Sequence, residues 1–179
     1  MHALARRRAT GYLLDCTGYL GIAAAIIPLG LAVNALTDLG SHRSYAYAVS
    51  AVHPAIATVV AARAESGPSR ATWGKRRRGL QVKDLRGAAV DEAPIPLPRA
   101  LLRNTVKIFV PWQLGHVTAV GAAYGDFETL RPATVVASVL TYGVIGTFAL
   151  TGLRGTGRGP HDLVAGTLVV SAAATPPRP

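Results

Sequence analysis

Long uncharged stretches alternate with short basic blocks along the chain. Residues 11–33 form one such stretch, with Asp15 as its only charge, and residues 133–153 form a second with no charge at all. Residues 45–62 contain no Lys, Arg, Asp or Glu but have His53 at their centre. A helix needs about 20 apolar residues, rising ~1.5 Å each, to cross the ~30 Å hydrocarbon core of a bilayer. The pattern therefore predicts membrane-spanning helices in these three ranges.

Residues 104–124 are a weaker candidate for a further span because polar residues interrupt them, among them Lys107, Pro111 and His116. This segment either crosses the membrane as the third of four spans, or 99–116 lies flat on the inner surface as an amphipathic helix. The fold class that follows is an all-α membrane protein. It is a bundle of four transmembrane helices, or of three with one interfacial helix.

The distribution of positive charge favours four spans. The chain carries 19 Lys plus Arg against 9 Asp plus Glu, a formal net charge of +10. With four spans, residues 1–10, 63–103 and 154–179 lie on one side and hold nearly all of the basic residues. Basic loops stay in the cytoplasm, so we expect a multi-pass protein of the bacterial cytoplasmic membrane with both termini cytosolic. The basic residues outside these segments are Arg43, Lys107 and Arg131.

Composition and length fit a single membrane domain over residues 1–179. Half of the residues are hydrophobic, which excludes a disordered chain, and the single Cys16 excludes a disulfide scaffold. The first span resembles a secretory signal, but its apolar run is longer than the usual ~7–15 residues and contains Asp15, so we expect it to be retained.

The loop 63–103 is the largest segment outside the predicted spans. Its basic run, residues 74–78, has only Trp73 as an aromatic neighbour, which favours contact with anionic headgroups at the cytosolic face over binding to nucleic acid. Residues 80–85 approximate the alternation of a strand, and residues 88–90 could return as the second strand of a small β-hairpin. Residues 91–98 contain three prolines and are predicted to be a linker.

Four segments resemble, in order, the motifs of the RDD family of small bacterial membrane proteins. They are residues 8–15 at the start of the first span, 71–82 in the basic loop, 99–104, and 161–167 after the last span. Where the family commonly has Pro in its loop motif, this chain has Trp73. Together the segments extend over nearly the whole chain, although residues 126–151 are poorly matched. The resemblance implies a polytopic helical membrane protein, sometimes linked to cation transport.

The family takes its name from one Arg and two Asp, and the resemblance assigns these roles to Arg8, Asp15 and Asp162. It also draws attention to Gly74 and Lys75 in the loop motif.

Asp15 lies about one turn inside the first span, where an ionisable group is costly and needs a partner. Lys107 lies at a similar depth in the weak span and is the first candidate partner. Arg8, two turns earlier on the same helix face, is the second. Such a pair either fixes the packing of the helices or takes part in ion or proton handling.

Asp162 follows Pro160, which is favourable at a first helical position, so its carboxylate can cap a helix. The alternative is an ion pair with Arg103 or Arg8 that joins the inner ends of the helices. His161 and His53 are isolated from other ligand types, so we expect no metal site and no cofactor. His53 either relays a proton, with Pro54 freeing a backbone carbonyl one turn earlier, or bonds a neighbouring helix.

No phosphate loop, nucleophile elbow or Cys–His arrangement is present in the sequence, so we expect no enzymatic activity. Two function classes remain. The first is a transport-related protein that handles ions or protons through its intramembrane charges. A chain this short would form a homo-oligomer to line a pathway. The second is an accessory or scaffold subunit that docks a partner membrane protein or anionic lipid.

Overall fold

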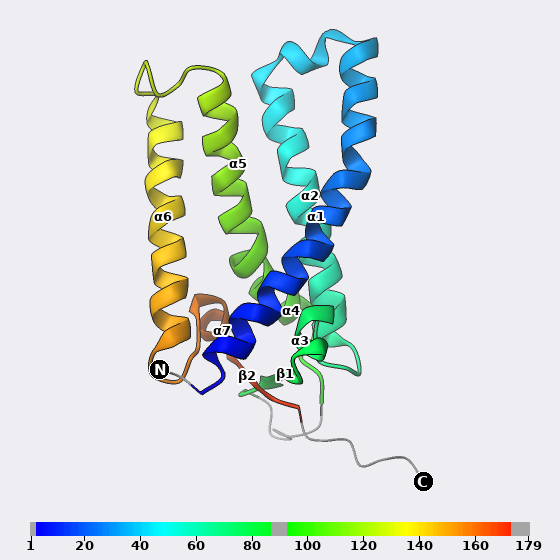
Figure 1. Ribbon diagram of the computed structural model, residues 1–179, viewed down its shortest axis with the longest axis vertical. Helices are drawn as coiled ribbons and strands as arrows, with labels where there is room; N and C mark the ends of the chain where they lie inside the picture. Colours follow the sequence, from blue (N-terminus) through cyan, green and yellow to red (C-terminus); the bar gives the residue numbers. More distant parts are fainter. Residues whose placement is uncertain (1–2, 87–92, 173–179) are drawn as a thin grey trace.

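The protein forms a mostly helical bundle in which long helices stand side by side and the short elements gather at one end (Figure 1). The structure is a computed structural model and describes residues 3–86 and 93–172. The start of α1 and the strand β2 lie at the end that holds the short elements. In chain order the elements are α1 (Ala5–Leu36), the 3₁₀ turn η1 (Asp38–Ser41), α2 (Arg43–Ser66), α3 (Trp73–Arg77), β1 (Leu80–Asp84), α4 (Leu97–Asn104), the π-helical turn η2 (Thr105–Phe109), α5 (Val110–Ala123), α6 (Pro132–Leu153), α7 (Pro160–Ala165) and β2 (Thr167–Ser171).

Within the described residues, three helices are long and apolar enough to cross a membrane: α1, α2 and α6. They correspond to the three clear spans of the hydropathy pattern and are each longer at one or both ends. The large hydrophobic side chains of α1 and α6, such as Leu29 and Val139, mostly face outward and are more than half exposed. A helix that is apolar yet not covered by protein suits a lipid surrounding. The structure therefore confirms that the fold is mostly helical with three helices able to span a membrane, which is consistent with a multi-pass membrane protein.

The range 104–124 is divided among the end of α4, the π turn η2 and the 14-residue α5. Pro111 explains the wide turn, because proline has no N–H to donate to the carbonyl of residue 107 and its ring clashes with that carbonyl. Above this point α5 runs beside α6, as Figure 1 shows, and the two are joined by the turn that follows Ala123. At ~1.5 Å per residue, the 14 residues of α5 alone rise about 21 Å, which is shorter than the ~30 Å hydrocarbon core of a bilayer.

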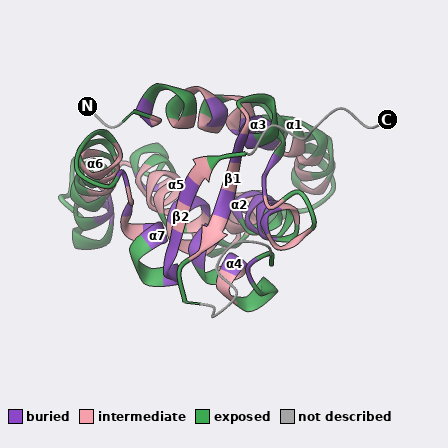
Figure 2. Ribbon diagram, turned by 90° about the horizontal axis from the view of Figure 1, so that it is seen from below, coloured by how far each residue is buried: buried purple, intermediate pink, exposed green. Residues whose placement is uncertain are grey.

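The predicted β-hairpin is replaced by a longer-range sheet. β1 pairs antiparallel with β2, in a register that places Leu80 opposite Ser171 and Asp84 opposite Thr167. The expected return strand, residues 88–90, lies outside the described residues, and so do residues 91–92 of the predicted linker. The buried side chains Leu80, Val82 and Val169 face the helices, so the sheet closes the lower end of the bundle (Figure 2).

Small residues let the central helices pack closely. Ala57 and Ala61 of α2 are fully buried, or nearly so, against Tyr19 and Ile108. Alanine at such positions brings helix backbones together, as in membrane helix packing generally. The same face of α2 continues to Glu65, which is also fully buried.

Candidate functional site: a buried charge network below a cavity

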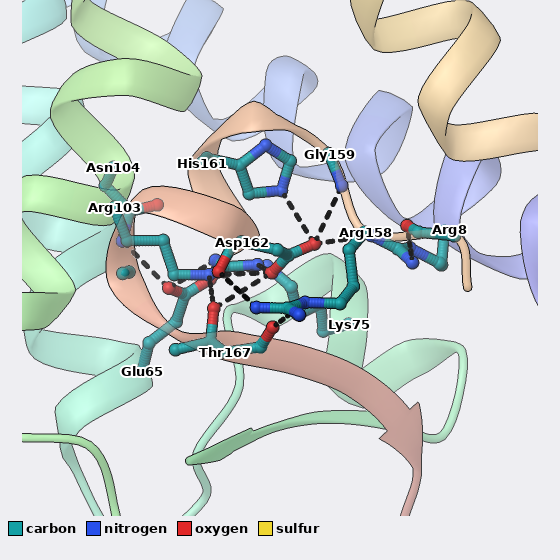
Figure 3. Close-up of polar contacts among 12 residues, drawn as sticks. Arg8, Glu65, Lys75, Arg103, Asn104, Arg158, Gly159, His161, Asp162 and Thr167 are labelled. Atoms are coloured by element: carbon teal, nitrogen blue, oxygen red, sulfur yellow. Dashed lines mark hydrogen bonds and ion pairs between the residues drawn. The ribbon is translucent and has the colours of Figure 1, made fainter. Parts of the chain in front are cut away.

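A fully buried arginine joins two carboxylates at the end of the bundle that holds the short elements (Figure 3). Arg103 of α4 donates from Nη1 to both oxygens of Glu65, at 2.7 and 2.6 Å. Its Nη2 donates to Oδ1 of Asp162 at 2.9 Å. Arg103 thus links α2 to α7, and the paired N–H groups of guanidinium suit this double recognition of carboxylates.

Further donors complete the hydrogen bonding of the Glu65 and Asp162 carboxylates. Glu65 also accepts from Lys75 Nζ at 2.6 Å and from Asn104 Nδ2 at 2.8 Å. Asp162 also accepts from Arg8 Nη2 at 2.9 Å and from the hydroxyl of Thr167 at 3.0 Å. Arg8 additionally donates to the carbonyl of Gly157. Buried charges are stable only when paired and hydrogen-bonded in this way.

Arg103 and Asp162 each stabilise the charged form of the other. Burial by itself would raise the pKa of Asp162, but the positive charges of Arg103 and Arg8 outweigh it and hold the pKa below its usual value. Burial would likewise lower the pKa of Arg103, but Glu65 and Asp162 raise it above its usual value. Both groups therefore stay charged at neutral pH.

Asp162 also has the capping role that its sequence position suggested. Its carboxylate accepts from the backbone N–H of Gly159 at 3.3 Å, at the start of α7. The two alternatives considered for Asp162, a cap and an ion pair with Arg103 or Arg8, are thus both present. His161 Nε2 lies 3.3 Å from Asp162 Oδ2, and its ring stacks on Phe148 of α6.

Asp15 does not form the predicted ion pair. Its Oδ2 accepts from the Thr72 hydroxyl at 2.6 Å, and its Oδ1 accepts from the backbone N–H of Gly74 at 2.7 Å. Within the described residues it is joined by no salt bridge to Lys107, and Arg8 is engaged with Asp162 instead. The carboxylate of Asp15 therefore satisfies one free N–H at the start of α3, that of Gly74, as a capping side chain would.

The contact between α1 and α3 requires glycine at position 74. A Cβ added to Gly74 would overlap the carbonyl of Gly11 and approach the Asp15 carboxylate to 2.9 Å. The close approach is what brings the Gly74 N–H within reach of Asp15.

These contacts form one continuous network that begins and ends on α1. Thr72 connects Asp15 to Lys75, whose Nζ lies 3.3 Å from the Thr72 hydroxyl. Lys75 then leads through Glu65 and Arg103 to Asp162 and back to α1. We call this set the charge network. Its members are Arg8, Asp15, Glu65, Thr72, Lys75, Arg103 and Asp162.

Lys107 lies beside the charge network but outside it. It is only 9% exposed and is positioned on the π turn η2. Within the described residues its Nζ has no carboxylate within salt-bridge distance, and its defined contact is with the Tyr12 ring, 4.8 Å from the centroid. π-Helical turns are frequent at functional sites, because they re-aim a side chain at a cost in helix regularity.

A cavity of about 440 Å³ lies between the first half of α1 and the last half of α6. Lys107 lines it, together with Arg8, Asp15, Lys75 and Arg103 of the charge network. His161 lines it as well, and its buried Nδ1 has no hydrogen-bond partner among the described residues. Five charged side chains therefore border one cavity.

A second polar group lies higher in the bundle, between α2 and α5. The ring of His53 is 4.8 Å from the ring of Trp112 and 6.2 Å from that of His116. His53 Nε2 donates to the carbonyl of Tyr19 at 2.8 Å, which is the bond to a neighbouring helix that the sequence allowed. Gln113 donates to the Ser50 hydroxyl at 3.3 Å, and His116 interacts with the Ser50 backbone. Ser50 precedes Pro54 by four residues, so its carbonyl lacks a helical donor.

At the opposite end of the bundle, Asp126 closes the connection between α5 and α6. It accepts from Arg43 Nη1 at 2.7 and 2.9 Å and from the Thr134 hydroxyl at 2.6 Å, and it lies 3.7 Å from Arg131. The two basic residues assigned to this side by the charge pattern therefore share one acid.

Glu65 and Thr72 are the main members of the site that the sequence analysis missed. Glu65 follows Ala57 and Ala61 at intervals of four, so helical periodicity places it on the same buried face. That spacing was the available signal for Glu65. For Thr72, no comparable signal exists, since its role depends on how the loop folds back against α1.

No group of three or more His, Cys, Asp or Glu side chains is placed to hold a metal ion among residues 3–86 and 93–172. No protein-family model, curated protein or solved structure matches this chain.

Proposed function

We propose that the chain is a four-span cytoplasmic-membrane protein of RDD type, with both termini and the short elements in the cytosol. Support comes from the clustering of α3, α4, α7 and the sheet at one end, together with most of the basic residues (Figure 1). The third span is the run of η2 and α5, from Thr105 to Ala123, which continues directly from the end of α4. The three residues that the resemblance singles out, Arg8, Asp15 and Asp162, belong to one network, which supports this proposal.

The function that fits this geometry best is transport-related handling of ions or protons at the cavity. The observation that carries it is Lys107, a lysine more than nine-tenths buried that faces a cavity and has no carboxylate partner among residues 3–86 and 93–172. An ionisable group inside a membrane bundle is costly and usually functional. Because no salt bridge from the described part of the chain fixes its charge, this ammonium can bind an anion or release its proton.

The charge network supplies a rigid base for this role. Each of its acids already accepts at least two hydrogen bonds, so the network holds α1, α2, α4 and α7 together rather than exchanging ions. Movement is expected instead at η2 and Pro111, where the helix is already irregular. The polar side chains His53, Gln113 and His116 form a separate group between α2 and α5 that does not line the cavity.

Flux through liposomes tests this proposal. Purified full-length protein is reconstituted, and proton and alkali-cation flux are followed for the wild type, Lys107→Gln and Asp15→Asn. Lys107→Gln should abolish flux with the fold intact. Asp15→Asn should reduce the flux only to the extent that the substitution loosens α3 from α1, because Asp15 is hydrogen-bonded to Thr72 and Gly74.

The matched control is Arg76→Gln. It removes an exposed positive charge of α3 that does not line the cavity, whereas Lys107 does. It should transport like the wild type. Background flux that is the same for all four proteins would eliminate the transport proposal.

The second candidate is an accessory subunit that docks a partner protein or anionic headgroups. The observation in its favour is the exposed basic run of Arg76, Arg77 and Arg78 at the same end of the bundle. Arg77 lies over the Trp73 ring at 5.4 Å, which fixes one guanidinium next to an aromatic surface. The outward apolar faces of α1 and α6 also leave room for a second copy of the chain. Equal flux in all variants, combined with loss of vesicle binding in Arg76→Gln, would favour this candidate.

A further inference from the structure

The cavity between α1 and α6 combines apolar walls with a charged floor. On the α6 side it is lined by Val144, Ile145 and Phe148, and on the α1 side by Ala5 and Ala9. Its floor is formed by members of the charge network. Its volume of about 440 Å³ falls within the ~300–1,000 Å³ typical of small-molecule sites.

The charges at the floor leave one positive charge uncompensated. In the charge network, the cations Arg8, Lys75 and Arg103 balance the acids Asp15, Glu65 and Asp162. Lys107 adds one more ammonium to the same cavity. Burial and the nearby Arg103 lower the pKa of His161 well below its usual value, so its ring adds no further charge. The floor is therefore suited to one negative charge.

The surroundings of the cavity are apolar and uncovered. Leu13 of α1 is 64% exposed, and Leu150 of α6 is 54% exposed. In a bilayer, hydrocarbon would surround both helices beside the cavity. A soluble anion would gain nothing from these walls, whereas a hydrocarbon chain would bury apolar surface against them.

We propose that this cavity is a binding site for a membrane lipid whose headgroup carries a single negative charge. The headgroup phosphate accepts from Lys107 Nζ, and the upper part of one acyl chain packs against Ile145 and Phe148. The remainder of the lipid stays in the bilayer. This site goes beyond the transport role proposed above and does not depend on it, because a lipid can bind here whether or not the protein moves ions.

Lipid retention tests the site directly. The full-length chain is placed in nanodiscs of phosphatidylglycerol and phosphatidylcholine in equal parts. The protein is then released from the nanodiscs, and native mass spectrometry identifies the lipid that stays bound to it. The wild type should retain one phosphatidylglycerol in clear preference to phosphatidylcholine. Lys107→Met should lower that retention by about tenfold or more, because a hydrogen bond to a charged group is lost. Lys107→Arg should keep it.

Two further variants separate binding from folding and from surface charge. Gly152→Leu adds a side chain where nothing lies within 4 Å of the added Cβ, so it fills the cavity without displacing existing contacts. It should reduce phosphatidylglycerol retention although Lys107 is unchanged. Arg76→Met, on the exposed basic run, should leave retention at the wild-type level.

Three results would overturn the proposal. The first is equal retention by the wild type and Lys107→Met, with both folded as judged by circular dichroism. The second is equal retention of the two lipids by the wild type. The third is displacement of phosphatidylglycerol by inorganic phosphate, which would show an anion site without a lipid requirement. Lipid retention without any ion flux would leave this site standing and remove only the transport role.

Discussion

Arg103 holds more of the structure together than any other single side chain in the charge network. Replacing it with Met leaves Glu65 and Asp162 buried without their shared cation. Breaking a buried ion pair from one side costs about 3–5 kcal/mol. We therefore expect Arg103→Met to lower the free energy of unfolding by about that amount, measured by denaturant titration in detergent micelles.

A conservative variant and a surface variant sharpen this prediction. Arg103→Lys keeps the charge but cannot bond both carboxylates with the same geometry, so it should restore only part of the stability. Arg76→Met should leave the unfolding free energy nearly unchanged because Arg76 is exposed. If Arg103→Met were as stable as Arg76→Met, the network would not have the role assigned to it.

His161 should make stability depend on pH in a mildly acidic range. Burial, and then the charge of Arg103, lower its pKa well below 6.5, although Asp162 and Glu65 oppose this shift. The folded protein keeps the ring neutral, whereas the unfolded chain takes up a proton below pH 6.5. The stability contributed is therefore complete above this pH and falls as the pH drops, by at most about 1.4 kcal/mol per pH unit.

His161→Phe removes this titration while keeping an aromatic ring against Phe148. We expect a flatter profile of unfolding free energy between pH 7 and about pH 5 for the variant than for the wild type. Asp162 does not interfere, since its pKa is lowered from 3.8 and it titrates below this window. Parallel profiles for the two proteins would contradict the neutral, buried state of His161.

Individual side chains were predictable where helix position decides their surroundings. Asp162 follows a proline that starts a helix, so its cap could be foreseen, and basic residues on neighbouring helix ends were natural partners. Asp15 was paired wrongly with Lys107. Its actual partners are a loop hydroxyl and a backbone N–H, and neither carries a charge that a sequence pattern can reveal.

Between elements, the packing of α3 against α1 should depend on Gly74. Gly74→Ala places a methyl group against the Gly11 carbonyl and the Asp15 carboxylate, so the two elements must separate. Overpacking of this kind costs about 1–3 kcal/mol. We expect a lower thermal unfolding midpoint in detergent and faster proteolysis of the loop that contains α3.

The matched variant is Gly143→Ala in α6, where an added Cβ meets nothing within 4 Å. In a helix interior, alanine is favoured over glycine by about 0.5–1 kcal/mol. This variant should be as stable as the wild type or slightly more stable. A Gly74→Ala protein that behaves like Gly143→Ala would argue against close contact between α1 and α3.

The long helices were foreseen more accurately than the elements between them. Uncharged runs located α1, α2 and α6 to within six residues at each end, because apolar length alone decides such helices. β2 was missed. Its five residues follow directly on α7, and its partner β1 lies more than 80 positions earlier in the chain, so no local pattern identifies the pairing. Pro111 helped to mark 104–124 as a weak span, but a single proline does not reveal the π turn.

At the scale of the whole molecule, charge is distributed unequally between the two ends of the bundle. One end holds the charge network and the basic run, and the other holds Asp126 with Arg43 and Arg131. The positive-inside rule assigns the first end to the cytosol. Ser41, the last residue of η1, and Thr156, which follows α6, are both exposed. η1 and the end of α6 lie at opposite ends of the bundle (Figure 1).

Cysteine labelling of these two positions tests the four-span arrangement most directly. Single cysteines are introduced at Ser41 and Thr156 in a Cys16→Ala background and treated in intact cells with a reagent that does not cross the membrane. The account predicts that the cysteine at position 41 reacts from outside, and that the one at position 156 reacts only after the cells are opened. Reaction of position 156 in intact cells would mean an odd number of spans and would contradict the proposed topology.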